Sequence, residues 1–315
     1  MTPSRPIVCF TAALAIAFSP GLAAALPDLL RGAIDLHCHS GPDIVPRSVT
    51  DIELARQGQA AGLRAVVIKN HHTPTAARAQ LASVAVPGIE VFGGIALNHA
   101  VGGLNATAVR RMTEMEGNRG KFVWLPTFDA ENAVRAANES RPFVSVVAQG
   151  QPVPALAEIF AVAARHQLVL ATGHSSAAES LVLIAAAKAA GVQHIVVTHA
   201  LFPSSRATEV ELRAMASLGA WIELAWLMHH TPKPAPGLPA VLARPMVPLA
   251  RAVDVIRDLG ARHIVISSDF GQASNPPPTE GLRAFLTALL AAGIPPADLD
   301  LMVRRNPAAI LGLEP

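Results

Sequence analysis

Tyrosine is absent from the 315-residue sequence, and aromatic residues make up only 4% of it. No tyrosine hydroxyl can therefore act as an acid, a base or a ligand. Charged residues are 15% of the chain, the formal net charge is +2, and no basic stripe occurs, which argues against nucleic acid as a partner. No Gly-rich phosphate loop follows an expected strand, so nucleotide binding has no motif behind it. Hydrophobic residues, at 51%, are enough for a large core.

Cysteine is also scarce, and the first of the two cysteines lies in a segment with the pattern of a secretory signal. In residues 1–25, Arg5 is followed by an apolar stretch that is too short to span a membrane, and three alanines at 23–25 offer a cleavage site. We therefore expect residues 26–315 to form the mature domain in the periplasm or outside the cell. The alternative is a cytoplasmic protein with an N-terminal helix. Removal of Cys9 would leave Cys38 alone, so no intrachain disulfide could form.

Beyond residue 26, eight short apolar runs alternate with alanine-rich helical patterns. The runs are 33–38, 64–69, 91–97, 121–126, 168–173, 194–198, 219–224 and 263–268. Eight strands that are each followed by a helix predict an α/β fold of the (β/α)8 TIM-barrel type. Residues 144–151 predict a small hairpin inserted before the fifth barrel strand, and the proline-rich stretch 231–248 predicts a loop over one mouth. No shift in composition marks a second domain.

The first apolar run ends in the pattern His37-Cys38-His39. Alternate side chains of a strand point to the same face, so His37 and His39 are expected to project together, away from Cys38. Two imidazoles side by side at a strand end are the beginning of a metal site.

Three further metal-type ligands follow later barrel strands. His174 ends the fifth run, His199 ends the sixth and Asp269 ends the eighth. The carboxyl ends of barrel strands build the active site, so all five side chains are expected at one mouth. Histidine and carboxylate are the ligands that zinc prefers when it keeps one position open.

This ligand set resembles the amidohydrolase superfamily of metal-dependent hydrolases, which places His-x-His on strand 1, one His on each of strands 5 and 6, and an Asp on strand 8. The stretch 306–313 resembles the closing helix of many members, and the stretches 35–43 and 172–175 resemble a poorly characterised branch of the superfamily. The resemblance spans residues 30–315 and implies a divalent metal, zinc before others, that activates water to attack an amide, lactone or ester. It implies one tightly held metal on His37, His39, His174 and Asp269. Asp269 would be the general base.

His199 has two readings under this resemblance: it holds a second metal, or it polarises the substrate carbonyl. The chain also departs from two-metal members, which often carry a bridging carboxylated Lys or a Glu at the end of strand 4. Here Lys121 stands at the start of that run, and Lys69 instead ends the second run. Lys69 would be a carboxylated ligand, a cation for a substrate carboxylate, or a side chain that reaches out to solvent.

Other polar groups near the same mouth would bind a small and possibly anionic substrate. Arg47 is suited to bind a substrate carboxylate because a guanidinium forms two hydrogen bonds with it at once. His71, His72 and His99 follow the second and third expected strands. Glu223, at the end of the seventh run, is expected to be solvated or to cap a helix.

Three rival functions remain open. The first is a metal-dependent decarboxylase or hydratase-type lyase on the same scaffold, and the second is a PHP-like phosphoesterase. The stretch Asp269-Phe270-Gly271 lacks the Asp-x-His pair of the PHP type, which counts against that rival. The third is a barrel that binds a metal or solute without catalysis. The sequence leaves the substrate, the metal and the choice between monomer and homo-oligomer undecided.

Overall fold

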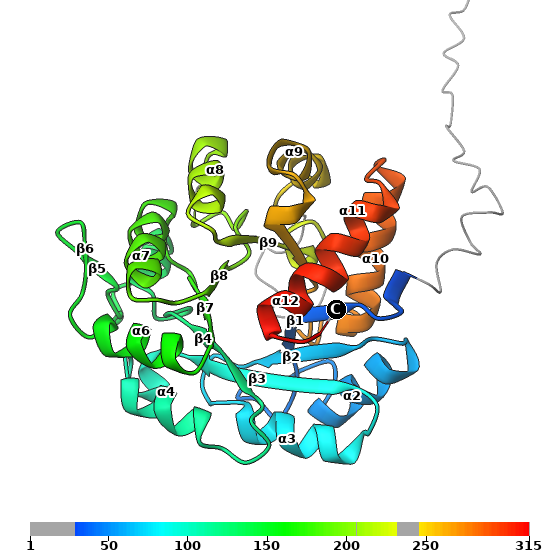
Figure 1. Cartoon of the computed structure of the whole chain (residues 1–315), viewed down its shortest axis with the longest axis horizontal. Coiled ribbons are helices and arrows are strands. Elements are labelled where there is room, and N and C mark those ends of the chain that lie inside the picture. The colour runs from blue at the N-terminus through cyan, green and yellow to red at the C-terminus, as the bar shows by residue number, and fades with distance from the viewer. Residues whose placement is uncertain (1–28, 206, 232–245, 315) are drawn as a thin grey trace, which may run out of the picture.

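The computed structural model describes residues 29–205, 207–231 and 246–314, and these confirm the predicted (β/α)8 barrel. Eight parallel strands pair in the order β1-β2-β3-β4-β7-β8-β9-β10, with helices around the outside (Figure 1). Their bounds are β1 (Ile34–His39), β2 (Ala65–Lys69), β3 (Glu90–Ala96), β4 (Gly120–Trp124), β7 (Val169–Ala171), β8 (His194–Val197), β9 (Trp221–Ala225) and β10 (Ile264–Ser267).

The outer helices follow the strands as expected, and several begin with capping boxes that satisfy their first N–H groups. They are α2 (Asp51–Ala60), α3 (Ala76–Ala85), α4 (Ala106–Thr113), α6 (Leu156–Arg165), α7 (Ala177–Ala189), α8 (Glu209–Ser217), α9 (Leu249–Leu259), α10 (Pro278–Ala291), α11 (Pro296–Asp300) and α12 (Asn306–Leu311). The expected hairpin is present as β5 (Val147–Ala148) and β6 (Gln151–Pro152). A short helix before it, α5 (Glu131–Ala136), was not predicted.

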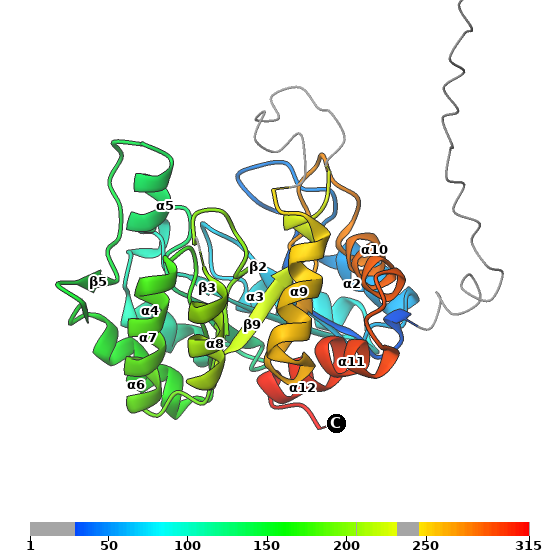
Figure 2. The same ribbon diagram turned by 90° about the horizontal axis from the view of Figure 1, so that it is seen from above.

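Two apolar cores lie on the two faces of the barrel wall. Alternate residues of every strand, such as Val67 and Trp124, fill the interior, and α12 adds Ile310 and Leu311 to them. The larger core lies between the strands and the helices. Figure 2 shows α12 and α5 at opposite ends of the molecule. The end opposite α12 is therefore the mouth at which the loops after the strands gather.

The barrel closes where β10 meets β1. The backbone N–H of His39 donates to the carbonyl of Phe270 at 2.7 Å, and the N–H of Asp269 donates to that of His37 at 2.9 Å. Deeper in the seam, Oδ1 of Asp35 accepts from the N–H groups of Ser268 (3.1 Å) and His37 (3.2 Å). A side-chain carboxylate thus replaces missing ladder bonds between the first and last strands.

A break in strand register sets the direction of the His-x-His side chains. The pairing of β1 with β2 shifts between Asp35 and Cys38, as in a β-bulge. Leu36 packs in the interior core, whereas Cys38 packs in the outer core, so the alternation changes phase between them. Bulges are common beside active sites because they re-aim side chains. Here the bulge turns His37 and His39 together toward the inside.

Two expectations fall on residues outside this description. The signal segment 1–25 and most of the proline-rich stretch, 232–245, lie beyond the described ranges. Among the residues that are described, no helix combines the length and apolar character needed to cross a membrane.

Candidate metal centre

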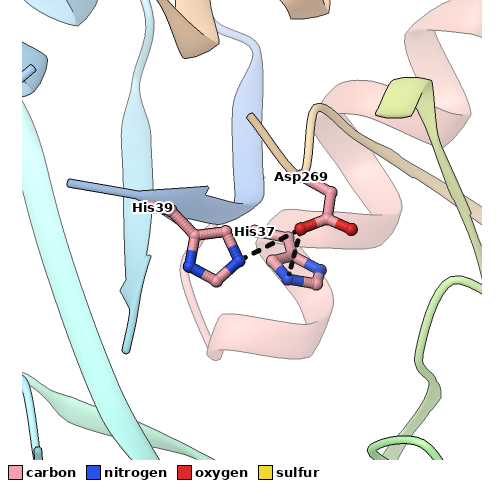
Figure 3. A group of neighbouring side chains, drawn as sticks. All are labelled: His37, His39 and Asp269. Atoms are coloured by element: carbon pink, nitrogen blue, oxygen red, sulfur yellow. Dashed lines mark hydrogen bonds and ion pairs between the residues drawn. The ribbon is translucent and has the colours of Figure 1, made fainter. Parts of the chain in front are cut away.

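The centre of the site is a group of three buried side chains, His37, His39 and Asp269, at the mouth of the barrel. One ligand atom from each lies within 4.8 Å of the others. Nε2 of His37 lies 3.0 Å from Oδ1 of Asp269, and Nε2 of His39 lies 3.1 Å from the same oxygen (Figure 3). The seam brings these residues together because Asp269 is the second residue after β10 and both histidines lie in the last half of β1.

Each of the two ring nitrogens of His37 lies against a charged side chain. Its Nδ1 lies 2.9 Å from Oε1 of Glu223. A carboxylate only accepts, so Nδ1 carries a proton that it donates to Glu223. Burial alone would lower the pKa of His37, but the charges of Asp269 and Glu223 outweigh it and raise this pKa to about 9. In this environment the ring readily holds a positive charge.

The prediction that Glu223 is solvated or caps a helix is wrong. Its side chain is 3% exposed and points into the barrel. Besides His37, it accepts from the hydroxyl of Ser267 at 2.6 Å and from the backbone N–H of His199 at 2.6 Å. Burial opposes ionisation, yet the charge and hydrogen bond of His37 hold the pKa of Glu223 at about 2. Glu223 is therefore an ionised carboxylate that links two of the predicted ligands.

The alternation of side chains along β9 indicates the direction in which Glu223 points. Ile222 and Leu224 pack in the outer core, so Glu223 between them must face the interior. A charged residue there needs partners, and the mouth of the barrel supplies them.

Asp269 and His199 both occupy the left-handed region of backbone conformation, with φ of 53° and 28°. Non-glycine residues rarely adopt it, and such strain clusters at functional sites. Burial would raise the pKa of Asp269, but the charges and hydrogen bonds of His37 and His39 hold it well below its usual range. Gly271 allows this turn to pass close to β1, since a Cβ there would lie 1.8 Å from the carbonyl oxygen of His39.

Lys69 points into the barrel, not out between the helices. Its side chain is 1% exposed, and Nζ lies 2.9 Å from Nε2 of His37 and 5.6 Å from the ring centre of Trp124. Burial lowers its pKa to about 8, while the charges of Asp269 and Glu223 oppose the shift. Lys69 therefore stands beside the three-residue group, in reach of anything bound there.

His174 and His199 form a second pair beside this group. Their ring centres are 4.9 Å apart, and the His199 ring stacks 5.8 Å from His37. Burial lowers the pKa of His199 to about 4 and that of His174 well below its usual range. His174 and His199 are not members of the compact three-residue group.

The predicted substrate-binding residues lie at different distances from the centre. His71 is buried and stacks on His39 with ring centres 4.9 Å apart, whereas His72 is partly exposed beside it. Arg47 is held by Asp43 at 2.6 Å, and its charge adds to the burial that lowers the pKa of His39 to about 3. His99 is exposed, and its backbone N–H donates to Asp129, so the structure does not bring its ring to the cluster.

These residues fit a divalent metal on their own chemistry. Two imidazoles and a carboxylate converge out of solvent, which is a donor set typical of zinc. Nδ1 of His39 and Nδ1 of His199 are buried without a hydrogen-bond partner in the described structure. Asp269 and Glu223 lie against the two ring nitrogens of His37, so their charges would favour a cation held in place of the proton of that ring.

The same fold occurs in several solved structures. An amidohydrolase from Pseudomonas aeruginosa aligns with a TM-score of 0.58 and 13% identity, over 92% of this chain and 98% of that one. The organophosphorus hydrolase from Deinococcus radiodurans gives 0.58 and 17%, over 89% and 92%. A zinc-containing amidohydrolase from Burkholderia multivorans gives 0.57 and 13%, over 90% and 99%. At these identities the likeness establishes the shared fold.

The chain belongs to DUF6282, a family of unknown function whose profile matches residues 32–223. The match includes both residues of the His-x-His pattern and Glu223, and it ends before Asp269. No curated protein matches the chain.

Proposed function

We propose that the protein is a metal-dependent hydrolase that cleaves an amide, lactone or ester of a small molecule. The observation that carries this proposal is the compact group of His37, His39 and Asp269, buried at the mouth of a barrel that is shared with amidohydrolases. These three residues would hold the metal, most readily zinc. A bound divalent metal supplies a Lewis acid and lowers the pKa of a coordinated water to about 7.

Each residue around the metal group has a task of its own. Glu223 fixes the ring of His37 by accepting from Nδ1, which leaves Nε2 as the ligand atom. Asp269 stays ionised at neutral pH, so it can accept the proton of the attacking water and return it to the leaving group. His199 is neutral at that pH, since its pKa is about 4, and its ring can donate to the carbonyl oxygen under attack.

Lys69 would bind a carboxylate of the substrate. Its position beside His37 supports this, because a buried ammonium is stabilised by a negatively charged partner. The same position would also suit a carboxylated lysine that serves as a metal ligand. A substrate carboxylate is also what a lyase on this scaffold would need, so decarboxylation is the second candidate.

Metal analysis together with a substrate screen tests the proposal. The purified protein should contain about one tightly held zinc per chain, and amides, lactones, esters and phosphoesters should be assayed with and without a carboxylate. We expect hydrolysis that is lost on treatment with a chelator and restored by zinc. Release of CO2 from a carboxylated compound would favour the lyase. A metal-free protein with undiminished hydrolysis would refute the proposed centre.

We further propose that residues 1–25 direct export. Sequencing the N-terminus of protein from the periplasmic fraction would show whether they are removed, and recovery of the full chain from the cytoplasm would contradict this.

A further inference from the structure

Two phenylalanines border the histidine cluster. Phe128 lies in the loop after β4, and Phe202 lies in the loop after β8. In the sheet, β4 and β8 flank β7, the strand that leads to His174. The two rings thus reach the same histidine from either side.

Phe128 is the outer member of a column of stacked rings. Its ring lies on His71 with centres 3.9 Å apart and planes at 19°, and His71 lies on His39 at 4.9 Å and 21°. The column ends at a predicted metal ligand. Phe128 itself is 46% exposed, so one part of the ring contacts the site and another part is open to solvent.

Phe202 takes the matching position over the second histidine pair. Its ring stacks on His174 with centres 5.6 Å apart and lies 5.0 Å from that of His199. Phe128 meets His174 edge-on at 6.0 Å. In the strand order of the closed barrel, β4 and β8 lie across from β10 and β2, the strands that lead to Asp269 and Lys69, so the two aromatic rings approach the histidines from the side opposite these charged groups.

The exposure of Phe128 is not the result of a loose loop. Oδ1 of Asn98 accepts from the backbone N–H groups on both sides of it, Thr127 at 2.8 Å and Asp129 at 3.2 Å. Arg141 donates to the carbonyl oxygen of Phe128. Three hydrogen bonds from two side chains hold the backbone, so the structure maintains a half-exposed apolar ring at the entrance of a polar site.

We propose that Phe128 and Phe202 bind a flat apolar group of the substrate, so that the natural substrate carries an aryl group next to the bond that is cleaved. The inference rests on the proposed hydrolase. Ligand pockets combine aromatic walls with a few polar groups that fix orientation, and here the two kinds of group stand on opposite sides. A stacked aromatic pair gains energy beyond the burial of its surface.

Two hydroxamates that share a metal-binding head provide the test. Benzohydroxamate and acetohydroxamate are titrated into the zinc-loaded protein by calorimetry, in the wild type and in Phe128→Ala and Phe202→Ala. We expect the wild type to prefer the aryl compound, and each substitution to weaken benzohydroxamate by about 3- to 10-fold while changing acetohydroxamate by less than about 2-fold. Phe143→Ala is the matched control, since Phe143 is 36% exposed and stacks on Arg135, away from the histidines.

The outcomes separate this inference from the proposed function. A zinc-loaded protein that binds both hydroxamates equally, or whose preference survives both substitutions, overturns the aromatic assignment whether or not hydrolysis is found. Failure to retain zinc defeats the metal centre instead. In that case benzamide and acetamide, titrated without metal, still test the aromatic rings: loss of the benzamide preference in the two variants supports the assignment, and equal binding refutes it.

Discussion

His37 and His199, one from each histidine pair of the site, are both buried but differ in the groups that surround them. His37 contacts two carboxylates, and its pKa is raised to about 9. His199 stacks 5.8 Å away, no carboxylate of the described residues is paired with its ring, and burial lowers its pKa to about 4 against the weaker effect of the Asp269 and Glu223 charges. The contrast shows that burial alone does not decide the charge of a ring, because neighbouring carboxylates can reverse its effect. His37 is therefore suited to carry a positive charge, whereas His199, like His39 with its pKa of about 3, is suited to act as a neutral ligand or donor.

Removing each pair in turn should give the largest difference. We expect His37→Ala combined with His39→Ala to abolish zinc binding, because both substitutions remove ligands from the compact group. His174→Ala combined with His199→Ala should keep zinc with lower affinity. Elemental analysis after dialysis measures both, with circular dichroism to check folding. If the second variant loses as much zinc as the first, the two pairs form one centre and the distinction is false.

Asp269→Asn tests whether the carboxylate of Asp269 is the general base that accepts the proton of the attacking water. General acid–base catalysis contributes about 10²–10⁴-fold, so the turnover number should fall by that order on whichever substrate the screen finds. Zinc content should fall less, since both histidines remain. Asp254→Asn, at an exposed aspartate of α9, is the control. Near-normal turnover by the Asn variant would exclude Asp269 as the base.

Glu223→Gln would remove one of the two carboxylate charges that contact His37, so the surroundings of His37 would become more like those of His199. We expect zinc affinity to fall by about 10- to 100-fold, as for other groups that orient a metal-binding histidine. Below pH 9 zinc must displace a proton from His37, so wild-type affinity should rise with pH toward about 9. Without the Glu223 charge the pKa of His37 is lower, and the rise should end at a lower pH.

Chelator competition between pH 6 and 9 measures the two affinity profiles. Glu116→Gln, at an exposed glutamate, is the matched control. Superimposable profiles for Glu223→Gln and the wild type would show that the carboxylate does not act through His37.

Lys69→Met should have the smallest effect. If the amine is a plain cation, affinity for a carboxylated ligand should fall by about tenfold, the value of one charged hydrogen bond, with zinc content unchanged. If the amine is carboxylated, zinc loading should fall instead, and wild-type loading should depend on bicarbonate. Lys121→Met, at the start of β4, is the control. No change in either quantity would leave Lys69 without a role in the site.

The barrel could be predicted because its signals are local. Each apolar run and each helical pattern lies within about a dozen residues, and the hairpin before β7 has its own turn residues. The helix α5 was missed because six residues carry too little periodicity to stand out.

The site was harder to predict because parts of it depend on distant partners. The common direction of His37 and His39 follows from alternation, but their inward direction comes from a bulge that Asp35 stabilises across the seam. The prediction for Glu223 was wrong because a charged residue in an apolar run suggests contact with solvent. Its neighbours in β9 face the helices, and the alternation of a strand then directs Glu223 into the barrel.

The seam between β1 and β10 has a consequence for the making of the protein. His39 and Asp269 are 230 residues apart in sequence and yet meet at one ligand position. A nascent chain exposes the His-x-His strand early, but the carboxylate emerges only after most of the barrel has been synthesised. A ribosome-stalled fragment that ends before β10 would hold the two histidines of the ligand group without the carboxylate. Tight metal capture would therefore mark a finished chain, and the captured ion would then favour the closed barrel over any opened form.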